Sequence, residues 1–172
     1  KAHDIILAGT FAYVATETGL TILDISNPAF PTIRGSVASP FGGNLGVAVK
    51  GQYAFVASRY AGLEVINVSN PDSPRIVASR KVGGQAWDVD VKDNIAYVAS
   101  FTGAFHLFDI SNPVSPRKVK SIGLPKWTKP GGDAANLQRL NELSGSGNAL
   151  TTGISVTGNV LVTVDWGLGR LY

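Results

Sequence analysis

The feature that most constrains this chain is an internal repeat. Ala12, Ala54 and Ala96 begin three similar segments spaced 42 residues apart, "AYVATETGLTILDISNP", "AFVASRYAGLEVINVSNP" and "AYVASFTGAFHLFDISNP". A fourth copy begins at Thr152 with "TGISVTGNVLVTVDWG". Self-similarity at a fixed period indicates copies of one supersecondary unit that stack on one another and bury a continuous core.

Each unit contains the pattern of four short strands. In the third unit we expect strands over 87–91, 95–100, 104–110 and 117–122, separated by "KDN", "FTG" and "SNPVSP". The last of these must be a turn, because each proline removes a backbone donor and the residue before a proline is pushed out of the α region. The turn recurs because every unit reverses direction at the same place, before its outer strand.

Four antiparallel strands with a period of about 42 residues are typical of β-propeller blades. Helical solenoids are excluded, since no unit shows a helical period. The predicted fold class is therefore all-β, a single partial β-propeller over residues 1–172. We expect blade 1 at about 3–37, blade 2 at about 45–82, blade 3 at about 87–122, an insertion at about 124–148 and the start of blade 4 at about 152–172.

The segments "GLTILDISNP", "GLEVINVSNP" and "AFHLFDISNP", each after "AYVA" or "AFVA", resemble the LVIVD repeat family. The resemblance implies a β-propeller of the kind found mainly in bacterial and archaeal proteins, often secreted or attached to the surface. It implies no shared catalytic motif. The second unit has Asn67 where the others have Asp24 and Asp109, which predicts a turn-capping or strand-end role for this position rather than a charge on which chemistry depends.

Composition narrows the possible classes of protein. The chain has no cysteine, which excludes disulfides, thiolate metal sites and cysteine nucleophiles and fits a location outside the reducing cytosol. No run of 18 apolar residues is present, so we expect no membrane span in this chain. The net charge is only +3 and its basic residues are dispersed, which argues against nucleic-acid binding. We expect an extracytoplasmic protein, whether secreted, periplasmic or on the cell surface.

The number of units predicts an incomplete ring. A propeller removes its open sheet edges by closing into a ring, whereas this sequence contains three units and half of a fourth. An arc of this kind would expose the apolar faces of its first and last blades. We therefore expect either a larger propeller of roughly six to eight blades or open flanks that pack on other protein subunits.

One insertion interrupts the period, because the spacing from Ile95 to Val160 is 65 residues rather than 42. Residues 131–147 predict a short helix with Asp133 as its N-cap and a stripe of leucines at 137, 140 and 143. Trp127 and Arg139 are candidate partner contacts, since function concentrates in long loops on rigid scaffolds. The alternative is a neutral surface insertion, which loops tolerate at little cost.

The sequence identifies no catalytic residue, metal site or cofactor. His3 and His106 occupy different strands, and neither has a second ligand at metal-binding spacing. Asp88 and Asp90 lie at i and i+2 on the innermost strand of the third blade, where the second blade has glycine and alanine. They either contact a cation or ligand beside the central channel or accept hydrogen bonds from the backbone of the neighbouring blade.

Further candidates follow from the repeat register. Asp4 shares the position of Asp88, and His3 shares that of Trp87, so these side chains could form a polar ring at the mouth of the channel. Trp166 is either a packed tryptophan or a partner anchor. The complete set of candidate contacts is His3, Asp4, Trp87, Asp88, Asp90, Trp127, Arg139 and Trp166.

Three functions are compatible with these observations. The first is a non-catalytic extracytoplasmic scaffold that binds protein partners, which predicts dispersed polar groups and an apolar contact along the open flanks. The second is the rigid lobe of a secreted or periplasmic oxidoreductase or hydrolase, which predicts that the insertion, His3, Asp4 and Asp88 converge on one pocket. The third is a carbohydrate-binding surface that uses Trp127 or Trp166.

Overall fold

The computed structural model describes residues 1–101, 104–123, 151–157, 160–165 and 170–171. These residues form four antiparallel sheets, and the first three sheets contain four strands each in chain order. The all-β architecture of four-stranded blades is therefore confirmed. The predicted insertion and its helix lie outside the described residues.

The strands follow the repeat. The first blade contains β1 (Ala2–Ala8), β2 (Phe11–Thr16), β3 (Gly19–Asp24) and β4 (Thr32–Ala38). The second blade contains β5 (Asn44–Lys50), β6 (Tyr53–Ser58), β7 (Gly62–Asn67) and β8 (Arg75–Arg80). The third blade contains β9 (Ala86–Lys92), β10 (Ile95–Ser100), β11 (Ala104–Asp109) and β12 (Arg117–Gly123). The fourth sheet contains β13 (Thr151–Thr157), β14 (Val160–Asp165) and β15 (Arg170–Leu171).

Tight turns join the first two strands of each blade. Gly9, Gly51 and Asp93 occupy the same turn position and have φ values of 60°, 58° and 51°. Two-residue hairpin turns require positive φ at their first central residue, which favours glycine and tolerates aspartate. The polar turn predicted at "KDN" is thus present, and its residue with positive φ is an aspartate, which such turns tolerate.

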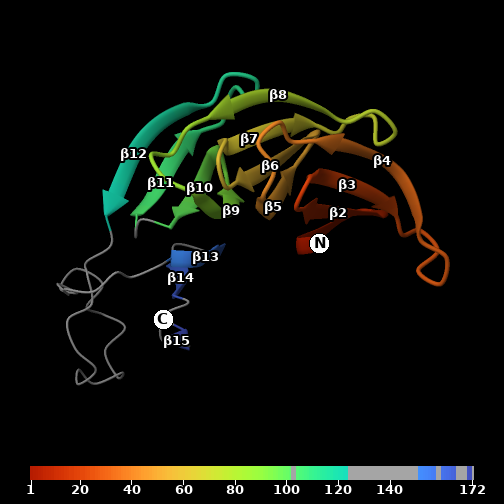
Figure 1. The fold of residues 1–172 in the computed structure, drawn as a ribbon, viewed down its shortest axis with the longest axis horizontal. Coiled ribbons are helices and arrows are strands. Elements are labelled where there is room, and N and C mark those ends of the chain that lie inside the picture. The colour runs from red at the N-terminus through yellow and green to blue at the C-terminus, as the bar shows by residue number, and fades with distance from the viewer. Residues whose placement is uncertain (102–103, 124–150, 158–159, 166–169, 172) are drawn as a thin grey trace.

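The blades fan out around a common centre (Figure 1). The innermost strand β5 lies beside both β1 and β9, and β9 also lies beside β13, while β4, β8 and β12 follow the outer rim. The apolar core lies at the junctions between blades. Leu20 and Ile22 of the first blade pack with Val56 of the second, and Phe55 of the second packs with Phe108 of the third.

The repeated turn before each outer strand is capped by the side chain that precedes it. The Ser26, Ser69 and Ser111 N–H groups each donate a 2.9 Å hydrogen bond to a side-chain Oδ1 two residues earlier. The acceptors are Asp24, Asn67 and Asp109. Because asparagine and aspartate serve equally, the predicted capping role of this position is confirmed.

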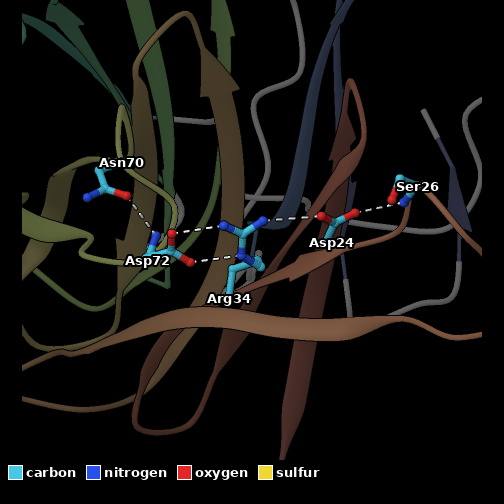
Figure 2. Close-up of polar contacts among 5 residues, drawn as sticks. All are labelled: Asp24, Ser26, Arg34, Asn70 and Asp72. Carbon is cyan, nitrogen blue, oxygen red and sulfur yellow. Dashed lines mark hydrogen bonds and ion pairs between the residues drawn. The ribbon is translucent and has the colours of Figure 1, made fainter.

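The same turn also joins neighbouring blades (Figure 2). Arg34 on β4 of the first blade donates two 2.8 Å hydrogen bonds to the carboxylate of Asp72 in the second blade's turn, and its third nitrogen lies 3.3 Å from Asp24. The hydrogen bonds from Arg34 lower the pKa of Asp72. At the next junction, Arg80 Nε donates to the carbonyl oxygen of Pro116 at 2.8 Å. Each turn therefore lies against the outer strand of the preceding blade.

The face of the first blade that points away from the second blade carries exposed apolar side chains. Ile5 and Leu7 on β1 are 57% and 62% exposed, and Ile33 on β4 is 71% exposed. Phe30, in the turn before β4, is 76% exposed. We call Ile5, Leu7, Phe30 and Ile33 the open flank.

The second blade shows the same face when another blade covers it. By strand register, Val47, Val49 and Ile76 correspond to Ile5, Leu7 and Ile33 of the open flank. All three of these second-blade residues pack against the first blade, and Val47 is only 4% exposed. The open flank therefore has the chemistry of a blade junction without the covering blade.

Candidate functional site

The candidate site is a cavity at the centre of the fan of blades. It has a volume of about 310 Å³ and lies among the three innermost strands β1, β5 and β9. Asp4, Asp88 and Asp90 line it together with aliphatic residues. Three carboxylates from two different blades therefore share one concave space, which suits a ligand that carries cationic or hydroxyl groups.

A bulge at the start of each innermost strand positions these side chains. The register of β1 with β2 shifts between Ala2 and Asp4, so His3 is the extra residue. The register of β9 with β10 shifts in the same place, which makes Trp87 the extra residue of the third blade. A bulge leaves one residue unpaired and increases the local twist, so the backbone N–H groups beside it need other acceptors.

Asp4 supplies two of those acceptors. Its Oδ1 accepts from the Ile5 N–H and its Oδ2 accepts from the Val47 N–H, each at 2.8 Å. The second bond crosses from the first blade to the second. The hydrogen bonding to a neighbouring blade's backbone that the sequence suggested for Asp88 and Asp90 is thus made by Asp4, at the equivalent position of the first blade.

Asp88 and Asp90 each accept a hydrogen bond from a backbone N–H group of their own strand. Asp88 Oδ1 accepts from the Val89 N–H at 2.9 Å, and Asp90 Oδ1 accepts from the Val91 N–H at 2.7 Å. A Cβ atom at Gly46 would lie 2.3 Å from Asp88 Oδ1 and 2.7 Å from its Cα. The glycine that replaces aspartate in the second blade thus allows β5 to approach β9 closely.

The other candidates do not converge on this cavity. His3 is exposed and is not among the residues that line the cavity. Trp87 stacks on Phe101, with ring centroids 5.6 Å apart, and the Arg59 guanidinium carbon lies 5.3 Å from the Trp87 ring centroid. Trp127, Arg139 and Trp166 lie outside the described residues.

Metal chemistry is not evident in the part of the chain that the structure describes. Within those residues, no group of three or more histidine, cysteine, aspartate or glutamate side chains could hold a metal ion. The three carboxylates in the cavity still supply too few ligands for Ca²⁺, which takes six to eight oxygens. The geometry therefore supports polar contacts to a ligand rather than a metal centre.

A second polar cluster lies between the first two blades. Glu64 on β7 is 1% exposed, and its Oε2 accepts a 2.8 Å hydrogen bond from the hydroxyl of Ser39, which follows β4 of the first blade. Burial raises the pKa of Glu64, while hydrogen bonds from Ser39 and Ser58 lower it by less. The buried side-chain amide of Asn44 has no hydrogen-bond partner among the described residues.

Sequence reasoning did not single out Glu64. The available signal was an acidic residue within the otherwise apolar "GLEVIN" strand. Strand register places His106 of the third blade at the same position, because Glu64 pairs with Val56 and His106 pairs with Val98. His106 is buried and its Nδ1 lies 2.8 Å from the Ser121 hydroxyl, and burial first and Lys118 second lower its pKa.

The fold and its centre define a β-propeller of repeated blades. A family model for the LVIVD repeat matches residues 1–39, 42–81 and 83–122. The chain therefore belongs to the LVIVD repeat family, as its repeated segments suggested. No curated protein sequence matches the chain.

Solved structures show the same architecture at low sequence identity. The computationally designed Ika4 protein is 9% identical with a TM-score of 0.67, and the match covers 100% of this chain and 89% of Ika4. The designed Ika8 protein is also 9% identical with a TM-score of 0.67, and the match covers 99% of this chain and 44% of Ika8. The N-terminal domain of Nup159 is 14% identical with a TM-score of 0.54, and the match covers 94% of this chain and 38% of that one.

The chain thus spans less than half the length of two of these structures. At such identities the likeness establishes the propeller-like fold alone. Within the described residues, no helix has the length and apolar character needed to cross a bilayer.

Proposed function

We propose that this chain is a non-catalytic, extracytoplasmic β-propeller segment that serves as a scaffold for protein interactions. The observation that carries the proposal is the open flank, in which Ile5, Leu7 and Ile33 are exposed where their counterparts Val47, Val49 and Ile76 in the second blade are packed. Contiguous exposed apolar surface on a folded protein marks sites of association.

The apolar side chains of the open flank favour a protein as its binding partner. Its branched aliphatic side chains on β1 and β4 offer no hydrogen-bonding groups with which to recognise a sugar or an ion. The second blade shows that the same surface is buried by the face of another blade. Further blades or other subunits with an apolar face are therefore the partners we propose.

The proposed location rests on two supports. The absence of cysteine suits compartments without thiol reductants, and proteins with this repeat are often exported. Protease treatment of intact cells tests the location. A surface protein would be degraded together with known surface markers, and a periplasmic protein would be released with known periplasmic markers on osmotic shock, whereas co-purification with cytosolic markers would contradict the proposal.

Native mass spectrometry of the protein purified from its own cells tests the scaffold role. We expect either a single chain well above 18.0 kDa, whose further blades cover the open flank, or a complex from which gentle dissociation releases the proteins that cover it. A species of 18.0 kDa that stays monomeric and captures no protein would contradict the scaffold function.

One observation favours a second candidate, the rigid lobe of an extracytoplasmic enzyme. Asp4 and Asp88 do line the same cavity, as that alternative required, although His3 does not and the insertion lies outside the described residues. Replacement of Asp88 and Asp90 by asparagine should then abolish turnover in a screen of hydrolase and oxidoreductase substrates. Turnover that survives both replacements would show that the cavity is not an active site.

A further inference from the structure

We propose that a row of aromatic and cationic side chains on one face of the propeller binds an acidic segment of a partner protein. The row consists of Phe41, Arg59, Tyr60, Lys81, Trp87 and Phe101, and we call it the cation–aromatic row. It shares no residue with the open flank or with the central cavity, so the proposed binding goes beyond the scaffold function and is tested separately.

The path of the chain places these residues on one face. Strands within a blade alternate in direction, so the loop between the second and third strands lies at the same end of the sheet as the link to the next blade. The links after β4 and β8 contribute Phe41 and Lys81. The loops after β6 and β10 contribute Arg59, Tyr60 and Phe101. All five therefore lie at the same end of the blades.

Lys81 joins the first part of the row. Its Nζ lies 4.8 Å from the ring centroid of Phe41 and also donates a hydrogen bond to the carbonyl oxygen of Tyr60. These contacts bring together the two links and the loop after β6. An ammonium group has three N–H donors, so a single hydrogen bond leaves it able to bind an external acceptor.

Arg59 and Trp87 form the second part of the row, and Trp87 enters it from the bulge at the start of β9. The Arg59 guanidinium lies over the Trp87 ring, which stacks on Phe101. The backbone is held as well, because the Arg59 N–H donates to the Gly43 carbonyl oxygen at 2.8 Å and the Phe101 N–H to that of Gln85 at 2.9 Å. A surface held in this way loses little conformational freedom on binding, which favours affinity.

The row is exposed although most of its residues are aromatic. Phe41 is 56% exposed, Tyr60 52% and Phe101 38%. Folded proteins rarely expose contiguous apolar surface without a binding role. Aromatic residues and arginine are also the side chains enriched at protein interfaces. The composition and exposure of the row are therefore those of a protein-binding surface.

The two cations of the row have no acidic partner among the described residues. The ion pairs found there are made by Arg34, Arg117 and the N-terminal amine, and none includes Arg59 or Lys81. Glu17 lies in a loop of the same face, but its carboxylate is 3.9 Å from the N-terminal amine. Cations that lack a partner beside exposed rings favour a ligand that carries carboxylates.

A protein segment is favoured over a sugar or a nucleic acid as the source of those carboxylates. Bases bind proteins by stacking on open aromatic faces, and sugar rings stack in the same way. Here Arg59 and Phe101 already lie against Trp87, and Lys81 lies against Phe41. The row instead suits a chain in which acidic residues alternate with apolar ones, because its cations alternate with exposed rings.

Nuclear magnetic resonance of the ¹⁵N-labelled chain tests this inference. The probe is the synthetic peptide EPEFEPEFEP, and the control peptide QPQFQPQFQP keeps the rings but removes the charges. We expect the acidic peptide to shift the amide resonances of the cation–aromatic row in a saturable manner. The control peptide should bind about 10-fold more weakly or less, and about 0.5 M salt should weaken binding of the acidic peptide.

Single substitutions locate the binding surface. Lys81→Gln should weaken binding of the acidic peptide about 10-fold, because it removes one of the two cations. Lys120→Gln is the matched control, since Lys120 is an exposed lysine on β12 outside the row, and binding should stay within about twofold of wild type. Arg59→Lys keeps the charge but loses the planar group over Trp87, and should weaken binding about threefold.

Three results would overturn the inference. The first is the absence of saturable shifts at about 1 mM acidic peptide. The second is a set of shifts centred on residues 117–120, where three cations in four residues would attract any anion. The third is tighter binding of oligogalacturonate or single-stranded DNA to the row. Each of them leaves the scaffold function intact, because that function is tested by the mass of the native complex.

Discussion

At the scale of single residues, one position of the third strand distinguishes the blades. Its occupant is Thr21 in the first blade, Glu64 in the second and His106 in the third. The latter two are the acidic and the imidazole side chains buried among the described residues. Both are favoured in their neutral forms, because burial penalises the charged form of either group.

The raised pKa of Glu64 predicts a dependence of stability on pH. A carboxyl group whose folded pKa lies above its unfolded value binds more protons in the folded state. Its contribution is therefore complete below the unfolded value of 4.5 and is lost as pH rises through the folded pKa. We expect Glu64→Gln to remove this decline, measured as the free energy of urea unfolding between pH 4 and pH 8.

Glu17→Gln provides the matched control for this measurement, because it makes the same substitution at an exposed position. His106 has the opposite effect. Its folded pKa is lowered, so its contribution to stability is complete above pH 6.5 and is lost as pH falls through the folded pKa. The difference between wild type and Glu64→Gln isolates the glutamate. An identical pH profile for both proteins would show that the surroundings of Glu64 do not disfavour its charged form.

At the scale of elements, close backbone approach joins the outer strand of one blade to the turn of the next. Gly35 on β4 lies against Pro71 and Asp72, and any side chain there would overlap the carbonyl oxygen of Pro71. The Arg34 hydrogen bonds to Asp72 flank this contact (Figure 2). The repeated turn therefore reverses the chain and also aligns neighbouring blades.

Gly35→Val should destabilise the protein by about 1 to 3 kcal/mol, because the new side chain forces the turn of the second blade away from β4. Thermal unfolding measures the effect. Gly123→Ala is the control, since Gly123 ends the outer strand β12 and a methyl group added there would meet no atom of the described residues within 4 Å. Equal stability of both variants would mean that the blades separate at this junction without cost.

At the scale of the whole molecule, burial concentrates in the second blade. Five of the six residues are buried in β6 and in β7, whereas the outer strands β4 and β12 are mostly exposed. Among the described residues, blades pack on both sides of the second blade, whereas the first blade has a neighbouring blade on one side only. Stability should therefore be distributed unevenly around the arc.

Hydrogen exchange measured by mass spectrometry should reveal this distribution. Amides of β6 and β7 should exchange most slowly, and those of β4 and β12 should exchange fastest among the strands of the three blades. The reason is that local opening of an outer strand exposes little apolar surface. Protection of β12 equal to that of β7 would contradict this order.

Much of the fold could be predicted from local sequence. The spacing of Ala12, Ala54 and Ala96, the turn residues and the alternation within strands sufficed for the blade architecture and for the strands of the third unit. The capping role of Asn67 followed from comparison of the repeats, because its hydrogen bond reaches only two residues along the chain. An interaction between residues two positions apart in the chain depends on local backbone geometry alone.

The candidate site was predictable only in part. The repeat register placed Asp4 and Asp88 at equivalent positions, but whether they share a space with Asp90 depends on how far adjacent blades rotate about the centre. The same limit applies to Glu64, whose partner Ser39 belongs to the preceding blade. The alternation of apolar and polar residues within a single strand encodes neither the surroundings of the cavity aspartates nor those of Glu64.

The sequence by itself thus determined the repeating unit, its strands and its capped turns, because these are set by backbone preferences and by contacts between near neighbours. Tertiary structure alone decided which carboxylates line the central cavity, which polar groups are buried at a junction and which apolar face stays open. These features join residues of different blades, and their distances depend on sheet twist and on the packing of one blade against the next.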